Sequence, residues 1–344
     1  MSSLTPVARA ILKNPPGRVA GTNLTATVFG ATGFLGRYVV AQLGKTGCTV
    51  VTPYRGDDLE ARHLKLMGDL GSIAQVPFSV RDKDSLRECV EGSDIVINLI
   101  GKHYETKHIV PWWINYTYDD VHVDAARDIA EVCAEMGVPR LIHFSSTLAK
   151  PNSASMWAAS KYRGEVAVRK AFPKANIVRS AIMYGSEDKF LNWYANRMST
   201  GGIPLIDNGA ARLQPVNVTD AAQALYALCV DKSIEGETFE LYGDEEYSAK
   251  EIVDYIVDVT KEDPNLLNLP LPLAEVVGKV AQLFPDPKFT HDLAIRMAMD
   301  QVKTGSLPGL RELGVEPTKL EKEAFSFLFK FNKGGHFQEV SGYH

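Results

Sequence analysis

Cysteine is scarce in this chain of 344 residues, which contains only Cys48, Cys89, Cys133 and Cys229. The four are widely spaced and form no Cys-x-x-Cys pair, so the sequence suggests neither a zinc cluster nor a redox dithiol. We expect buried thiols in a reducing compartment.

Long apolar runs and an excess of positive charge are also absent. The apolar stretches end well short of the ~20 residues that a membrane span needs. A formal net charge of −5, with neither a basic face nor an RNA-binding signature, argues against a nucleic-acid-binding protein. The 45% of hydrophobic residues is ordinary for a soluble globular protein.

Acidic residues are missing before Asp57, whereas arginines, lysines and hydroxyl side chains occur there. This composition resembles a mitochondrial targeting segment. A short flexible arm is the alternative for residues 1–23, which we treat as a basic N-terminal extension.

From Leu24 onward, short β-branched runs alternate with helical periods. Strands are expected at 26–29, 48–52, 76–80, 94–99, 139–145 and 176–181, and helices at 35–43, 84–90, 119–136 and around residue 160. This alternation predicts right-handed βαβ units and a parallel sheet. The fold class is therefore α/β, a doubly wound Rossmann domain over residues 24–185.

Shorter elements separated by Gly, Pro and Asn-Gly turns follow Gly185. A helix at 219–230 and a strand at 237–241 are expected, and segments around 215–242 return to the main sheet. Residues 186–344 otherwise form a smaller, mainly helical domain that faces partners. It contains an amphipathic helix within 264–287 and a capping box at 317–321 that opens a Phe-rich helix. The simplest role of both helices is to form the core of this domain.

The segment from Gly30 to Gly36, Gly-Ala-Thr-Gly-Phe-Leu-Gly, lies between the first strand and the first helix. Gly30 permits a tight turn, Gly33 lets backbone N–H groups reach a pyrophosphate, and Gly36 allows close helix–strand packing. In this context the spacing predicts a dinucleotide site rather than merely a tight turn.

The end of the second strand indicates which dinucleotide is bound. No acid precedes Arg55, and an arginine here accommodates the 2′-phosphate of NADP, whereas a carboxylate binds the ribose of NAD. The sequence thus favours NADP(H), with Arg37 adding positive charge. The alternative is that Arg55 is solvated and Asp57 or Asp58 binds the ribose.

A Tyr-x-x-x-Lys pair is missing. Trp157 stands four residues before Lys161, where a chain of this layout is expected to carry the tyrosine, and none of the 13 tyrosines is followed by a lysine four places on. One helical turn would let the lysine lower the pKa of a phenol and make it a usable acid or base. An indole N–H is far too weak an acid to transfer its proton in this way, so we assign no catalytic residue.

Several segments together resemble a known family. They include 26–55, 63–71 (His-Leu-Lys-Leu-Met-Gly-Asp-Leu-Gly), 98–101 (Asn-Leu-Ile-Gly), 140–146 and 269–273. These are similar to the NADPH-containing accessory subunits, of the alpha subcomplex, in mitochondrial respiratory complex I (NADH:ubiquinone oxidoreductase). Those subunits are divergent members of the extended, or atypical, short-chain dehydrogenase/reductase superfamily.

The resemblance implies an NADPH that is held and not turned over, as a structural or regulatory cofactor. It implies a peripheral location on the matrix side of the mitochondrial inner membrane. The implied partners are other complex I subunits, and the C-terminal helices are candidates for contact with neighbouring subunits or the membrane surface.

The resemblance also assigns positions. The superfamily's catalytic serine maps to Ser145 or Ser146 and its tyrosine to Trp157, while Lys161 remains to bond the nicotinamide ribose. Ser79 replaces an aspartate that often faces the adenine. The expected cofactor-binding residues are Gly30, Thr32, Gly33, Phe34, Leu35, Gly36, Arg37, Arg55, Ser79, Leu99, Ile100, Gly101, Ser145, Lys161 and Ile182.

Two other functions remain open at this stage. One is an active NADP-dependent reductase or epimerase that uses Tyr184 or Tyr162 as its acid, and the other is a stand-alone NADP(H)-binding regulator. His103 and His108 are more simply surface residues than metal ligands, so no metal site is expected. The aromatic residues Trp112, Trp113, Tyr116 and Tyr118 form either core or a partner-facing patch.

Overall fold

The computed structural model describes residues 24–105, 116–200, 202–262, 265–282, 287 and 289–332. The N-terminal extension, His108 and the Trp112-Trp113 pair lie outside the described residues. The chain divides into two compact units. The first comprises Met1–Ser180, Thr219–Leu241 and Ser306–Val315, and the second comprises Ala181–Val218, Tyr242–Gly305 and Glu316–His344.

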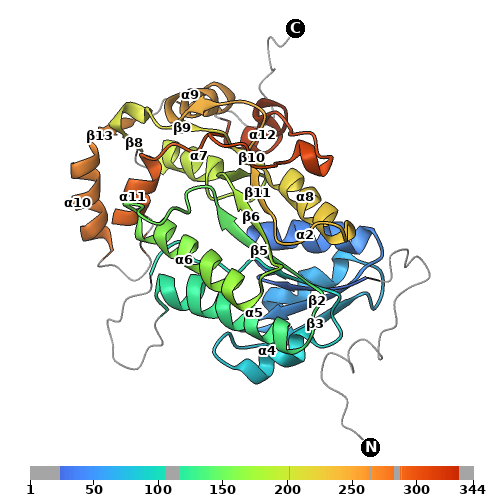
Figure 1. The fold of residues 1–344 in the computed structure, drawn as a ribbon. Coiled ribbons are helices and arrows are strands. Elements are labelled where there is room, and N and C mark those ends of the chain that lie inside the picture. Colours follow the sequence, from blue (N-terminus) through green and yellow to red (C-terminus); the bar gives the residue numbers. More distant parts are fainter. Residues whose placement is uncertain are drawn as a thin grey trace, which may run out of the picture. The chain divides into compact units, whose positions relative to one another are not determined.

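The first unit is built on a seven-stranded parallel sheet (Figure 1). Its strands are β1 (Thr25–Phe29), β2 (Thr49–Tyr54), β3 (Ile73–Pro77), β4 (Ile95–Asn98), β5 (Arg140–Ser146), β6 (Asn176–Ser180) and β11 (Thr238–Leu241). They are ordered β11-β6-β5-β4-β1-β2-β3, and every pair is parallel. The order reverses between β1 and β4, which is where doubly wound sheets bind ligands. The predicted α/β class is confirmed.

Helices cover both faces of this sheet. Figure 1 shows α4 (Lys83–Val90), α5 (Ala125–Glu135) and α6 (Met156–Ala171) on one face, with α2 (Phe34–Lys45) and α8 (Val218–Val230) on the other. A π-helical turn, η2 (Asp120–Asp124), leads into α5, and α3 (Asp58–Ala61) and η1 (Arg62–Met67) follow β2. Phe29, Leu86 and Ile129 are fully or almost fully buried between the strands and the first face of helices. Burial of this apolar area holds the sheet and its edge in place.

Two details of the first unit differ from the predicted ranges. Strand β3 ends at Pro77 rather than at residue 80, because the amide of Ser79 bonds the Ser85 hydroxyl (3.2 Å) instead of a neighbouring strand. Ser306–Val315, predicted within the C-terminal domain, belongs to the first unit, where the Glu240 amide donates to the Pro308 carbonyl (2.9 Å). The predicted return of the strand near residue 240 is confirmed, since β11 pairs with β6.

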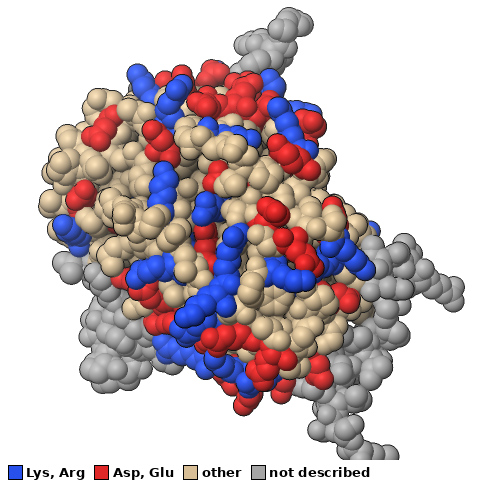
Figure 2. All heavy atoms as spheres, viewed as in Figure 1, with Lys and Arg blue, Asp and Glu red and all other residues tan. Residues whose placement is uncertain are grey.

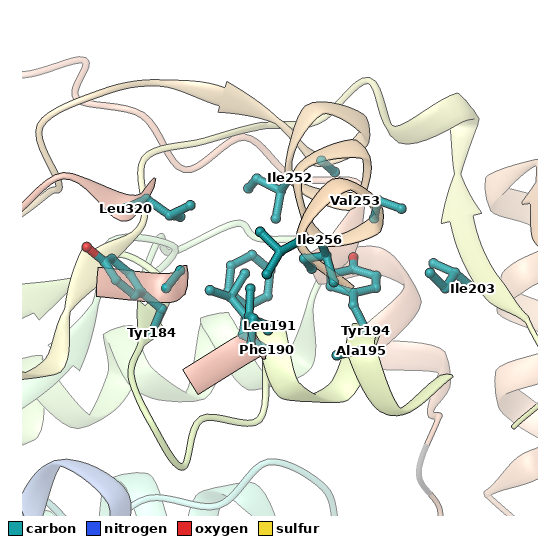
Figure 3. Close-up of a cluster of buried hydrophobic side chains, with 14 of the residues drawn as sticks. Tyr184, Phe190, Leu191, Tyr194, Ala195, Ile203, Ile252, Val253, Ile256 and Leu320 are labelled. Atoms are coloured by element: carbon teal, nitrogen blue, oxygen red, sulfur yellow. The ribbon is translucent and has the colours of Figure 1, made fainter. Parts of the chain in front are cut away.

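The second unit contains short strands and helices. Its elements are β7 (Met183–Tyr184), α7 (Leu191–Thr200), β8 (Ile203–Ile206), η3 (Asp207–Gly209), β9 (Arg212–Leu213), β10 (Val216–Asn217), β12 (Tyr247–Ser248), α9 (Ala249–Thr260), β13 (Leu266–Leu269), α10 (Leu271–Ala281), α11 (His291–Met297), α12 (Leu320–Leu328) and η5 (Phe329–Phe331). Figure 3 shows side chains of α7 and α9 meeting in its core, with Leu191, Ile252 and Ile256 almost completely buried. This core shares no residue with the apolar cluster that contains Phe29, Leu86 and Ile129 in the first unit.

Helix α10 is the predicted amphipathic helix, but the prediction that it contributes its large apolar side chains to a core is wrong. Ala274 and Gly278 are its buried residues. A side-chain carbon at Gly278 would lie 2.4 Å from the backbone nitrogen of His291, so the glycine permits this close packing. The exposed side chains, 43 to 57% accessible, are Leu273, Val276, Val277 and Val280. At the place of α10, Figure 2 shows mostly uncharged atoms.

The start of α12 also differs from the prediction. The helix begins at Leu320, with Lys319 as N-cap and no side-chain cap, so the predicted capping box does not form. The Thr318 carbonyl instead accepts a hydrogen bond from the Tyr184 hydroxyl (3.0 Å). Phe327 reaches the core, whereas Phe325 is 36% exposed.

All four cysteines are free and buried, as predicted. Burial raises the pKa of Cys89, Cys133 and Cys229 to about 12, which keeps these thiols protonated and unreactive. Within the described residues, no helix is long and apolar enough to span a membrane. The same part of the chain contains no group of three or more His, Cys, Asp or Glu side chains that could hold a metal ion.

Candidate nucleotide-binding site

The glycine turn lies at the carboxyl end of β1, in the middle of the sheet. Gly30 has φ +80°, and a side-chain carbon there would lie 3.0 Å from the Leu99 carbonyl carbon. At Gly36 such a carbon would lie 2.2 Å from the Gly30 oxygen. Both positions therefore require glycine, and the turn keeps α2 close against β1.

The N-terminus of α2 is arranged to attract an anion. Its N-cap is Gly33, no side chain caps it, and its first turn contains no acid. The first backbone N–H groups and the positive end of the helix dipole are therefore not neutralised by the helix itself. Thr32 and Gly33 are exposed, whereas Leu35 and Gly36 are buried against the sheet.

The turn after β4, which contains Leu99, Ile100 and Gly101, is fixed by the buried Asn98. Its Oδ1 accepts a hydrogen bond from the Ile100 amide (3.0 Å), and its Nδ2 lies 3.3 Å from His143 Nδ1 on β5. Burial, and secondarily the charge of Lys161, lowers the pKa of His143 to about 3, so the imidazole is neutral. Its Nδ1 then accepts from Asn98 and its Nε2 carries the proton, without a described partner. Neither side chain is among the predicted site residues, although a polar residue inside an apolar strand is a recognisable sequence signal.

The two serines at the end of β5 have different surroundings. Ser146 Oγ accepts a hydrogen bond from the Leu148 amide (3.3 Å) and belongs to the local turn. Ser145 Oγ is buried and has no hydrogen-bond partner among the described residues. A buried hydroxyl of this kind normally finds a partner, so Ser145 is the better placed of the two to meet a ligand.

Lys161 lies on α6 and is buried, with 6% of its surface exposed. Burial lowers its pKa to about 8, although the charge of Glu165 opposes the change. A side-chain carbon at Gly101 would lie 3.2 Å from the Lys161 ammonium, so the turn after β4 faces this group. The Glu165 carboxylate is paired with Arg179 at 2.7 Å. Within the described residues the ammonium has no hydrogen-bond acceptor.

Trp157 lies one helical turn before Lys161. Its indole N–H donates a 2.7 Å hydrogen bond to the Lys102 carbonyl, and its ring stands edge-on to the His122 ring. The ammonium of Lys161 is 5.9 Å from the ring centroid. The only N–H of the indole is therefore used to hold the backbone after β4.

His122 holds the other side of the same peptide segment. Its Nε2 accepts a hydrogen bond from the Lys102 amide (3.1 Å), and its Nδ1 lies 2.8 Å from the Ser160 hydroxyl. That hydroxyl also donates to the Trp157 carbonyl (2.7 Å). Both backbone polar groups of Lys102 are thus bound by side chains of the helical layer. No sequence pattern distinguished His122 from a surface histidine.

Arg55 and Ser79 follow β2 and β3, and both are exposed. The guanidinium carbon of Arg55 is 5.8 Å from the ring centroid of Tyr116. Asp57, the alternative ribose ligand, instead caps α3 by accepting a hydrogen bond from the Leu59 amide (3.2 Å). Arg37 lies on α2 beyond the glycine turn.

The first unit therefore brings together the ends of β1, β2, β3, β4 and β5 at one edge of the sheet, with Lys161 beside the turn after β4. All the predicted cofactor-binding residues lie on these segments except Ile182, which belongs to the second unit.

The two tyrosines considered as alternative acids are poorly suited to that role. Tyr184 is completely buried in the core of the second unit (Figure 3). Its hydroxyl donates a hydrogen bond to the Thr318 carbonyl. Tyr162 directly follows Lys161 on α6, and adjacent helical residues do not share a face.

Comparison with known proteins places these features in a family. The model of the NAD dependent epimerase/dehydratase family matches residues 26–241. The chain is 40% identical to "NADH dehydrogenase (ubiquinone) 1 alpha subcomplex subunit 9, mitochondrial" of Mus musculus, covering 91% of this chain and 81% of that protein. It is 37% identical to "NADH-ubiquinone oxidoreductase 40 kDa subunit, mitochondrial" of Neurospora crassa, covering 97% and 87%.

Solved structures agree with the fold. The NADPH-dependent quinone oxidoreductase QOR2 of Escherichia coli, complexed with NADPH, superposes with a TM-score of 0.67 at 18% identity. The match covers 88% of this chain and 99% of that one.

Proposed function

Since the chain belongs to the NAD dependent epimerase/dehydratase family and, within it, to the group of the mitochondrial alpha subcomplex subunit 9, we propose that it is an accessory subunit of NADH:ubiquinone oxidoreductase. In this proposal it binds NADPH as a structural or regulatory cofactor and does not turn it over. Its partners are the other subunits of the complex, on the matrix side of the mitochondrial inner membrane.

The residues present fit a dinucleotide. The uncapped N-terminus of α2 and the turn at Gly30 suit a pyrophosphate. The buried Ser145 hydroxyl and the Lys161 ammonium, both without acceptors in the described chain, suit the amide and ribose hydroxyls of a nicotinamide riboside. Arg55 suits a 2′-phosphate, and Asp57 is occupied as a helix cap. Bound NADPH would supply a hydride, and reduction of a carbonyl with that hydride would also require a proton donor at the site.

The observation that carries the proposal is the hydrogen bond between Trp157 Nε1 and the Lys102 carbonyl, 2.7 Å long. Trp157 occupies the position where a proton donor is expected. This hydrogen bond uses the only N–H of its side chain to hold the backbone. Lys161 and Ser145 are buried without a described acceptor, and Trp157 stands where a tyrosine would pair with Lys161. The side chains suited to binding the cofactor are present, whereas the expected tyrosine acid is replaced by Trp157. This combination favours a cofactor that stays bound over one that is turned over.

The exposed apolar side chains of α10 support a subunit role. Four large aliphatic side chains on one 11-residue helix are 43 to 57% exposed, which is unusual for a helix that has no partner. We propose that this surface faces neighbouring subunits or the inner-membrane surface.

Gentle purification of the native protein tests the main proposal. We expect the protein to co-purify with other subunits of the oxidoreductase and to release NADPH on denaturation. Recovery as a free monomer that oxidises NADPH with a small carbonyl substrate would instead establish the active reductase.

The choice of NADPH is tested by Arg55→Ala. Loss of one charge-assisted contact is expected to weaken NADPH relative to NADH by roughly 1.5–3 kcal/mol, measured by calorimetric titration. Equal affinity for both cofactors before and after the substitution would exclude Arg55 as the ligand of the 2′-phosphate.

A further inference from the structure

Three cations from three strand ends surround the ring of Tyr116. The guanidinium carbon of Arg81 is 4.3 Å from the ring centroid, that of Arg55 is 5.8 Å away, and the Lys102 ammonium is 5.9 Å away. These residues follow β3, β2 and β4 respectively. Together they flank β1, whose carboxyl end carries the glycine turn.

Arg81 and Arg55 both lie over the ring of Tyr116, which sets an upper limit on the distance between them. Their distances to the same centroid limit the separation of the two guanidinium carbons to about 10 Å. Both side chains are exposed, whereas Tyr116 and Lys102 are half-buried. Because both arginines are exposed, a change of side-chain rotamer would let both guanidiniums contact one anion at the mouth of the site.

Two carboxylates of the described chain lie near this cluster of three cations. Asp120 Oδ2 is 3.9 Å from Arg81, with both side chains well exposed, and it also accepts a hydrogen bond from the Thr117 amide (2.9 Å). Glu105 accepts from the Tyr118 amide (3.1 Å). Burial, and next the charge of Arg55, lowers the pKa of Lys102 despite the opposing influence of Glu105 and Asp120. Among the described residues, three cations and two carboxylates thus lie around Tyr116, which leaves the net positive charge that a site for an anion requires.

We propose that Arg81 is a second arginine for the 2′-phosphate of NADPH, held beside Arg55 by the ring of Tyr116. A guanidinium offers parallel N–H groups that match phosphate oxygens, and two guanidiniums recognise a dianion better than one. Tyr116 acts as a positioning residue, because cation–π contacts with its ring hold both guanidiniums beside it. This inference rests on the proposed binding of NADPH and extends it to the residues that determine its preference over NADH.

The test compares adenosine 2′,5′-bisphosphate with AMP on the full-length protein, by calorimetric titration. The two ligands differ at the 2′-phosphate, so the nicotinamide half of the site does not contribute. Arg81→Ala is expected to weaken the bisphosphate about tenfold and to leave AMP unchanged. Arg62→Ala is the matched control, since it removes an exposed arginine of the same unit that lies outside this cluster.

Substitution of the ring supplies a second readout. Tyr116→Phe keeps the π face and is expected to keep the preference for the bisphosphate, whereas Tyr116→Leu is expected to reduce it severalfold. A merely structural role for Tyr116 would weaken both ligands alike. Thermal unfolding of each variant establishes that it is folded before titration.

The outcomes separate the two proposals. If the wild-type protein prefers NADPH and Arg55→Ala abolishes the preference, but Arg81→Ala changes nothing or weakens both ligands equally, the role of Arg81 is refuted and NADPH binding stands. If the wild-type protein shows no preference for NADPH over NADH, the proposed cofactor itself is refuted.

Discussion

Binding of NADPH is expected to draw a proton from solution onto Lys161. In the described residues its ammonium is buried without an acceptor, and burial lowers its pKa from 10.5 to about 8. Ribose hydroxyl oxygens would accept its N–H groups, and the cofactor's phosphates would favour its charge. The pKa of Lys161 should therefore return toward its ordinary value when the site is filled.

The size of the effect follows from that shift. A change in the pKa of Lys161 from about 8 to its ordinary value of 10.5 corresponds to about 3 kcal/mol of differential interaction between its two protonation states. At pH 8 half of the free protein carries a neutral amine, so binding should take up about half a proton per molecule. Because binding raises the pKa, NADPH affinity should fall as the pH rises from 8 toward 10. The free protein, whose pKa is depressed, should gain stability over the same range.

Calorimetric titration at pH 8 in buffers of different ionisation enthalpy measures the uptake directly. Lys161→Met, which keeps the unbranched side chain up to the Cε position and removes the charge, is the control. Uptake by other groups, such as Lys102, persists in this variant, so the difference between the two proteins is the informative quantity. An equal uptake in wild type and variant would refute the assignment of the proton to Lys161.

Two further substitutions test the surroundings of this lysine. Trp157→Phe keeps an aromatic ring and removes the bond to the Lys102 carbonyl, so the free energy of unfolding should fall by about 1 kcal/mol in urea titration. An unchanged value would mean that the indole N–H does not hold the segment after β4. Ser145→Ala removes a buried hydroxyl that has no described partner and should leave the stability of the free protein unchanged or raise it by up to about 1 kcal/mol. The same variant should bind NADPH more weakly, and unchanged affinity would place Ser145 outside the site.

Much of the first unit was predictable from the sequence because local physics specifies it. Alternating β-branched runs and helical periods marked the strands and helices, and crossover handedness then restricted them to one sheet. The glycines of the turn after β1 were readable because only glycine tolerates the backbone at Gly30 and the contact at Gly36. The absence of the catalytic tyrosine could likewise be read from the sequence, because Trp157 stands four residues before Lys161.

The errors arose where packing overrides pattern. An amphipathic pattern indicates that α10 has an apolar side, but not that Ala274 and Gly278 would face the unit while the larger residues face outward. The predicted capping box does not form because α12 begins only at Leu320, so that Lys319 and not Thr318 is the N-cap, and the Thr318 carbonyl accepts a hydrogen bond from a tyrosine 134 positions away. Neither contact leaves a local signal.

The sequence by itself determined the sheet, the phosphate turn and the loss of the tyrosine, because each depends on residues within one or two elements. Only the tertiary structure decided what surrounds them. It assigned the indole N–H to the Lys102 carbonyl, left Ser145 rather than Ser146 available, and gathered Arg55 and Arg81 around one ring. Burial and proximity arise from chain segments that meet only when the sheet is assembled, so no local pattern encodes them.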